Sequence, residues 1–268
     1  MRVLPRWLWL GCLCLGCQSL SAVSISPRAR EARQQWEEGL AAMERGEIDK
    51  AVSCYEQSLA ADPKEARPHL SLAAAFLEKG EDEAAQTHLA EYVHAHPQNL
   101  GVRIRHAELL LRLKRRSEAG TELERVVADA QNLAEPPPHQ LIHCQTRLME
   151  IAEADGDEYG IHLHRGIGVY FIACQRGRLE DAAEKSCTEA LLCQAAGDLA
   201  LAHLERPEEA RPCWYLYEVW TRLDQTKPAL HNLREADASA PFSYLTPAEK
   251  NCLFLARERL PHDLAYRR

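Results

Sequence analysis

Histidines and cysteines are the residues whose types and spacing could support chemistry in this chain. His139 and His143 are four residues apart, so a helix would place both imidazoles on one face, as a zinc site requires. Two imidazoles do not complete a metal site, and the nearby sequence supplies no obvious carboxylate as a third ligand. The alternative is the polar start of a helix that follows three prolines. We favour this alternative and expect no bound metal ion.

The other candidate groups are scattered. His162 and His164 are two residues apart and would point to different faces of a helix, so they would not chelate one ion together. Cys174 and Cys187 lie on the two arms of one predicted hairpin and could pair if the chain is exported. The sequence contains no glycine-rich phosphate loop, no G-x-S-x-G motif and no H-E-x-x-H motif. We therefore predict no catalytic residues and no cofactor.

The densest aromatic cluster is WYLYEVW at residues 214–220. It could form a platform for a small ligand. However, Trp214 and Tyr217 are three residues apart and would share the helix face that packs on a neighbouring hairpin. We favour this core interpretation and expect no small-molecule substrate.

Composition limits the fold class and the partners. The 268 residues include 32 Lys and Arg against 40 Asp and Glu, a net charge of −8. No basic domain stands out, which argues against nucleic acid as the main partner. Aromatic residues are only 6%, whereas Ala and Leu are abundant. This favours closely packed helices over sheets.

The first residues have the layout of a secretory signal peptide. Arg2 and Arg6 precede an apolar run over residues 7–15, which is too short to span a bilayer as a mature helix. We therefore assign residues 1–16 to a signal peptide and residues 17–31 to a tether.

The end of this run resembles the lipobox of bacterial lipoproteins. Gly16 and Cys17 match that pattern, whereas Cys14 stands where Leu is usual. The resemblance implies that Cys17 carries the lipid. In that family, a residue other than Asp after the lipidated cysteine implies sorting to the outer membrane, here on its periplasmic face, and residue 18 is Gln. Cys12 is a second candidate. An ordinary signal peptide, or a cytoplasmic protein that is never exported, remain as alternatives.

Small residues recur with a period of 34 residues in the first half of the chain. Two columns are in phase: Gly39, Ala73 and Ala107, then Ala51, Ala85 and Ala119. A glycine pair (Gly46 and Gly80) and a proline pair (Pro63 and Pro97) keep the same step. A glycine ends a helix where positive φ is needed, and Asp62-Pro63 stops the next one. The pattern predicts helices over 32–45, 48–61, 68–79, 83–96, 102–113 and 117–130.

This pattern resembles the tetratricopeptide repeat family, which has a small residue at place 8, Ala at place 20 and Pro at place 32 of each repeat. The resemblance covers three repeats over residues 32–133, although Gln131 stands where the third Pro is expected. It implies an all-α solenoid of about five helix–turn–helix hairpins, wound as a right-handed superhelix with a concave face.

The second half is less regular. Three prolines at 136–138 indicate a rigid linker over residues 134–138 that breaks the array. Beyond it, residues 139–268 are expected to add further hairpins, with helices over 139–154, 159–176 and 179–196. Ala229 and Pro241 match the repeat again within residues 210–241. Thr246 and Glu249 form a capping box that predicts a closing helix to about residue 260.

Function follows from the resemblance. Places 5, 9 and 12 of each first helix line the concave face in this family, and they commonly contact an extended peptide or a helix. Here these groove positions are Trp36, Leu40, Met43, Leu70, Ala74, Leu77, Ile104, Glu108 and Leu111. We therefore predict a non-enzymatic adaptor, anchored in the envelope by lipid only, whose protein partner is apolar or amphipathic rather than strongly acidic. The alternatives are a soluble cytoplasmic scaffold, or a ligand-binding or enzymatic module in residues 139–268.

Overall fold

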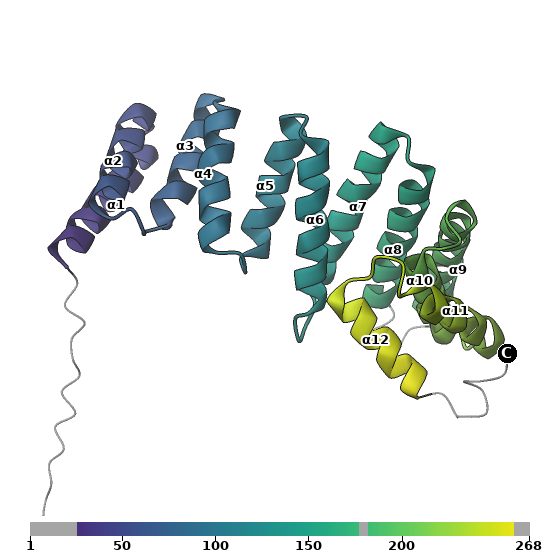
Figure 1. Ribbon diagram of the computed structural model, residues 1–268. Coiled ribbons are helices and arrows are strands. Elements are labelled where there is room, and N and C mark those ends of the chain that lie inside the picture. The colour runs from purple at the N-terminus through teal and green to yellow at the C-terminus, as the bar shows by residue number, and fades with distance from the viewer. Residues whose placement is uncertain (1–25, 177–181, 260–268) are drawn as a thin grey trace, which may run out of the picture.

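The computed structural model describes residues 26–176 and 182–259, and twelve helices lie within these two ranges (Figure 1). The first six are α1 (Pro27–Glu44), α2 (Ile48–Ala61), α3 (Arg67–Lys79), α4 (Asp82–Ala95), α5 (Leu100–Arg112) and α6 (Arg116–Gln131). The next six are α7 (Pro138–Asp155), α8 (Glu158–Arg176), α9 (Ala182–Glu205), α10 (Ala210–Arg222), α11 (Thr226–Ser239) and α12 (Pro247–Glu258). The part of the chain that the structure describes contains no strand. The predicted all-α helical solenoid is confirmed.

The first helix is longer than its prediction. The Ser26 side chain accepts a hydrogen bond from the backbone N–H of Ala29 at 3.1 Å, and Pro27 occupies the first turn. A capped start with proline at this place favours a helix from residue 27 onward. Residues 27–31 were predicted as part of a tether and are instead helical, while residues 1–25 lie outside the described residues.

The hairpin turns share one backbone conformation. Gly46, Gly80 and Gly156 have φ of 75°, 74° and 71°, a region that glycine enters without steric cost. Lys114 (φ 61°) and Asp224 (φ 55°) occupy the corresponding turns of the α5/α6 and α10/α11 hairpins. Lys114 lies 34 residues after Gly80. The repeat therefore imposes a left-handed turn even where the sequence does not supply glycine.

The small residues of the repeat lie at helix crossings, as predicted. A Cβ atom added to Gly39 would come within 2.4 Å of Cε1 in the Tyr55 ring. Ala51, Ala85 and Ala119 are fully buried. The remaining alanines of the pattern, Ala73, Ala107 and Ala229, are also buried, whereas Pro63, Pro97 and Pro241 lie exposed near helix ends. Larger side chains at the buried places would separate the paired helices.

The helix stack continues across the three prolines. Leu141, Cys144 and Leu148 of α7 belong to one buried cluster together with Ile104 of α5 and Leu123 of α6. The prolines therefore shape a connection between α6 and α7 but do not interrupt the core, because α7 packs directly on the preceding hairpin. This differs from the break in the array that the sequence indicated.

The second half departs from regular hairpins between α7 and α10. Gly156 joins α7 to α8, and α8 also packs along α9. Helix α9 runs from Ala182 to Glu205, later and longer than the predicted 179–196. Residues 177–181, where the predicted helix over 159–176 gives way to the one over 179–196, lie outside the described residues. The α10/α11 hairpin follows the repeat as predicted. Leu233 stands four residues after Ala229, as Tyr55 stands four residues after Ala51, and Leu233 is 1% exposed.

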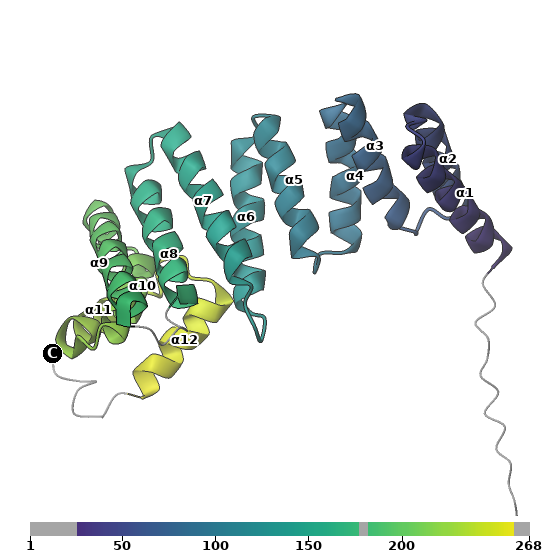
Figure 2. The ribbon, with the colours of Figure 1, turned by 180° about the vertical axis from the view of Figure 1, so that it is seen from behind.

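The predicted closing helix is present and folds back toward the middle of the chain. Thr246 and Glu249 form the capping box that begins α12. Figures 1 and 2 both show α12 running from the end of α6 along the side of the second half, rather than extending the stack. Leu253 and Ala256 pack in the core of α8–α11. No helix in the described ranges is long and apolar enough to cross a membrane.

Candidate partner-binding groove

The first hollow of the candidate site lies between α3 and α5. It has a volume of about 290 Å³, and Leu70, Ala74 and Leu77 of α3 line it. These are three of the predicted groove residues. Ala73 and Ala74 are small and leave room between the two leucines, and Leu77 is 39% exposed. Arg105, Glu108 and Arg112 of α5 form the opposite wall.

A second hollow follows between α5 and α7. It has a volume of about 450 Å³, and two predicted residues, Glu108 and Leu111, line it from α5. The other wall contains residues that the sequence analysis did not select: Arg147, Glu150, Ile151 and Ala154 of α7, with Arg116 of α6. Glu108 lines both hollows, so they adjoin. We call them together the α3–α5–α7 groove.

The predicted α1 residues lie beside this groove and have a partly structural role. The Trp36 indole Nε1 donates a hydrogen bond to Ser71 Oγ of α3 at 2.9 Å, and the Arg67 guanidinium lies 4.7 Å from its ring centroid. Trp36 and Met43 are half-buried, while Leu40 is 38% exposed. Trp36 therefore fixes α1 to α3, and Leu40 offers the more accessible apolar surface.

Ile104 does not line an exposed strip. It is only 8% exposed and belongs to the core that α5, α6 and α7 share. Ile104 was predicted as a groove position, and its burial contradicts exposure there. The physical reason is the continuous stacking of α7 across the prolines, because this stacking places Ile104 in the core. The neighbouring Arg105 is exposed on α5 instead.

Two arginines of α5 are among the groove residues that sequence reasoning missed. Arg105 and Arg112 are seven residues apart, which places them on one side of α5. Each stands next to a predicted apolar groove position, Ile104 or Leu111. The seven-residue spacing of the two arginines could have indicated a charged side of α5. The sequence analysis selected the adjacent apolar residues instead.

His143 has a partner that the sequence did not reveal. Its Nε2 lies 2.9 Å from Glu108 Oε1, across the gap between α7 and α5, whereas His139 is exposed at the start of α7. Glu108 precedes His143 by 35 residues, so stacking of successive hairpins brings them together. Among residues 26–176 and 182–259, no group of three or more His, Cys, Asp or Glu side chains could hold a metal ion.

Cys174 and Cys187 do not form a disulfide, and His162 and His164 do not contact a common partner. Cys174 and Cys187 are both free thiols, and Arg176 Nη1 lies 3.2 Å from Cys187 Sγ. His162 approaches Asp198 (Nδ1 to Oδ1, 3.6 Å), while His164 contacts Gln145. The two histidines therefore face different neighbours, as predicted.

The aromatic cluster at residues 214–220 is part of the core. Trp214, Tyr215 and Val219 are buried, whereas Tyr217 and Trp220 are half-buried and pack against the same cluster. The core interpretation of Trp214 and Tyr217 is confirmed.

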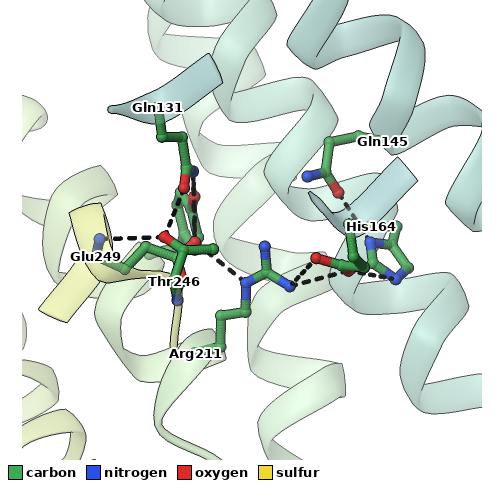
Figure 3. Close-up of polar contacts among 8 residues, drawn as sticks. Gln131, Gln145, His164, Arg211, Thr246 and Glu249 are labelled. Atoms are coloured by element: carbon green, nitrogen blue, oxygen red, sulfur yellow. Dashed lines mark hydrogen bonds and ion pairs between the residues drawn. The ribbon is translucent and has the colours of Figure 1, made fainter. Parts of the chain in front are cut away.

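A buried polar cluster connects α12 to four other helices (Figure 3). Arg211 of α10, only 3% exposed, donates from Nε to Glu249 Oε1 and from Nη1 to Glu124 Oε1, each at 3.1 Å. The Tyr215 hydroxyl donates to Glu249 at 2.8 Å, and Thr246 Oγ1 donates to Gln131 Oε1 at 2.6 Å. Burial alone would lower the pKa of Arg211, but Glu249 and Glu124 raise it well above its ordinary value.

His164 completes the cluster as a neutral side chain. Its Nδ1 bonds with Gln145 Oε1 at 2.8 Å, and burial together with the Arg211 charge lowers its pKa to about 3. Glu124 lies 3.9 Å from His164 Nε2, but its carboxylate is already paired with Arg211. None of the residues labelled in Figure 3 lines the groove. The cluster holds the second half together, and the groove is the candidate functional site.

Comparison with known proteins gives a family match over part of the chain. Residues 42–99 match the family model described as tetratricopeptide repeat. The match covers 58 of the 268 residues. It runs from the end of α1 through α4 and so includes the α3 wall of the groove. Comparison with the curated proteins gives no match.

Several solved structures resemble the chain at low identity. PilF of Pseudomonas aeruginosa is 16% identical, with 86% of this chain and 99% of that chain covered and a TM-score of 0.41. YrrB, described as a TPR protein with an unusual peptide-binding site, is 14% identical, with coverages of 88% and 100% and a TM-score of 0.38. The first TPR of Spaghetti, bound to an HSP90 peptide, is 20% identical, with coverages of 48% and 96% and a TM-score of 0.39.

Proposed function

We propose that this protein is a non-enzymatic adaptor that holds a segment of another protein in the α3–α5–α7 groove. The observation that carries the proposal is the first hollow, where Leu70 and the exposed Leu77 face arginines across small alanines. Apolar surface left exposed in a hollow is typical of partner sites. Arginine is also enriched at such interfaces and among their dominant contacts.

The test is partner capture from a cell-envelope extract by the full chain and by the variant Leu77→Lys. A cationic side chain in the hollow blocks an apolar occupant without disturbing the core, because Leu77 is substantially exposed. Leu204→Lys is the matched control, since Leu204 lies on α9 away from the groove and is 72% exposed. We expect Leu77→Lys to lose the captured proteins that the wild type and Leu204→Lys retain. Equal capture by all three would contradict binding in the groove.

Leu70→Glu together with Trp36→Ala is a second variant of the same surface. Both side chains are half-buried, so circular dichroism must first show that the helices are intact. If capture survives in this folded variant, binding lies elsewhere on the chain, and residues 139–268 become the better candidate.

We further propose that the adaptor is held at a membrane by lipid on Cys17. Residues 1–25 lie outside the described residues, so the support comes from Arg2, Arg6, the apolar run and Gly16-Cys17. With 30 Lys and Arg remaining against 40 Asp and Glu after residue 16, the mature chain gains no attraction to an anionic membrane surface, and the lipid must anchor it. The proposed location is the periplasmic face of the outer membrane.

Mass spectrometry of the mature N-terminus, from a bacterial host, tests the anchor. We expect a lipid-modified Cys17 at the new N-terminus, and we expect Cys17→Ala to leave the membrane fraction. A cytoplasmic product that starts at Met1 or Arg2 with a free Cys17 thiol would instead favour the soluble scaffold.

A further inference from the structure

The lining of the α3–α5–α7 groove does not share the acidic excess of the whole chain. The chain carries a net charge of −8, which led to the expectation of a partner that is not strongly acidic. The residues that line the two hollows include four arginines and two glutamates: Arg105, Arg112, Arg116, Arg147, Glu108 and Glu150. Exposed charges more than about 10 Å apart are largely screened at physiological salt. The groove lining therefore decides which partner charge is attracted.

The acidic residues of the groove are already paired. Glu108 contacts His143 at 2.9 Å and Arg147 at 3.7 Å, and Glu150 contacts Arg147 at 2.7 Å. Arg112 and Arg116 pair with acidic residues outside the lining, Asp82 and Asp155. These groove carboxylates consequently have little remaining attraction for a basic partner.

Arg105 differs from the other groove arginines. It is exposed on α5, lines the first hollow opposite Leu70 and Leu77, and has no hydrogen-bond or ion-pair partner among residues 26–176 and 182–259. A guanidinium presents several N–H donors in a planar fork that fits a carboxylate bidentately. The first hollow thus combines an apolar floor with one cationic group that is available to a ligand.

We infer that the groove takes a polypeptide segment in which a large apolar side chain fills the first hollow and a neighbouring carboxylate pairs with Arg105. This inference rests on the proposed function and specifies the chemistry of its partner. Arg112 lies two helical turns beyond Arg105, about 10.5 Å along α5. A second carboxylate at that distance would have to compete with Asp82 for Arg112, so its contribution is smaller.

The experiment uses a displayed library of random 12-residue peptides, selected against the full chain. For the strongest binders, synthetic pairs are made in which every Asp and Glu is kept or is replaced by Asn and Gln. Dissociation constants are measured by fluorescence anisotropy for the wild type, Arg105→Gln and Arg125→Gln. The last variant is the matched control, because Arg125 is on α6, does not line the groove and has a side chain 69% exposed.

We expect the acidic peptides to bind Arg105→Gln about tenfold more weakly than the wild type, as for one charge-assisted hydrogen-bonded pair. The neutral peptides should bind both proteins equally, and Arg125→Gln should match the wild type with both sets. Equal affinity of acidic and neutral peptides, or an unchanged affinity of Arg105→Gln for acidic ones, overturns the carboxylate assignment.

Leu77→Lys separates this inference from the proposed function. If the selected peptides bind Leu77→Lys as tightly as the wild type, they do not occupy the groove and the proposed function fails. If Leu77→Lys abolishes binding while Arg105→Gln does not weaken it, only the carboxylate assignment fails. A library that yields no binder contradicts both.

Discussion

Acid should destabilise this protein through His164 in the buried polar cluster. The pKa of this side chain falls from about 6.5 to about 3 on folding, because burial and the Arg211 charge disfavour the imidazolium. The unfolded chain therefore binds a proton that the folded chain does not between these two pH values. The stability contributed by the neutral imidazole is complete above pH 6.5 and is lost as the pH falls toward 3. Since pH 5 lies about 1.5 pH units below 6.5, the loss at pH 5 is about 2 kcal/mol.

The measurement is the free energy of unfolding in urea at pH 7 and pH 5, followed by circular dichroism, for the wild type and for His164→Gln. The variant removes the titrating group and keeps a polar side chain next to Gln145. His69, His88 and His106, whose pKa values are also lowered by burial, remain in both proteins, so their contributions cancel in the difference.

We expect the wild type to lose about 2 kcal/mol more than His164→Gln between the two pH values. His231→Gln is the matched control, because His231 is exposed on α11, and it should lose as much as the wild type. Equal losses in the wild type and His164→Gln would refute the assignment of a buried neutral histidine to the cluster.

Three further predictions concern the scaffold, each checked by urea unfolding. Lys114→Gly should raise the free energy of unfolding by about 0.5–1 kcal/mol, because glycine adopts the left-handed turn without strain. Gly80→Ala should lower it by about 1 kcal/mol for the same reason. Changes of the same sign in the two variants would contradict this explanation. Ala85→Leu should lower it by about 1–3 kcal/mol by overpacking a helix crossing, while the surface change Glu81→Ala stays within about 0.5 kcal/mol; similar values for the two would contradict close packing there. Arg211→Met should lower it by about 3–5 kcal/mol, because Glu249 is left buried without its cation; an unchanged value would mean that the cluster does not hold α12.

The fold of the first half was predictable because its signals are local. Gly46, Gly80 and Asp62-Pro63 mark helix ends within a few residues, and small residues at a step of 34 mark the crossings. Lys114 shows the limit of this approach. Its turn follows the repeat geometry, although lysine gives no sign of positive φ.

The position of α12 could not be predicted because it depends on contacts between distant residues. Gln131 contacts Glu249 across 118 residues, and Arg211 contacts Glu124 across 87. No periodic pattern links such pairs. One sign was present, because Gln131 replaces the proline expected at the end of the third repeat. In the structure its side chain bonds with Tyr215, Thr246 and Glu249, so this departure from the repeat marks the attachment point of α12.

The groove could be predicted only in part, because contacts between distant residues also decide which of its side chains are exposed. On α3, places 5, 9 and 12 selected Leu70, Ala74 and Leu77, and all three line the first hollow. On α5 the same rule selected Ile104, which α7 helps to bury, and passed over Arg105. Apolar spacing locates a helix face, but which residues of that face remain exposed depends on how the next hairpin packs.

The proposed function requires a polypeptide partner to bind in the α3–α5–α7 groove. Methyl NMR of leucine-labelled protein, titrated with a peptide from the library selection, tests it most directly. We expect the methyl signals of Leu70, Leu77 and Leu111 to shift with peptide concentration, while those of Leu204 and Leu255, which are exposed on α9 and α12, stay in place. Shifts confined to Leu204 or Leu255 would place the binding surface in the second half of the chain and contradict the account.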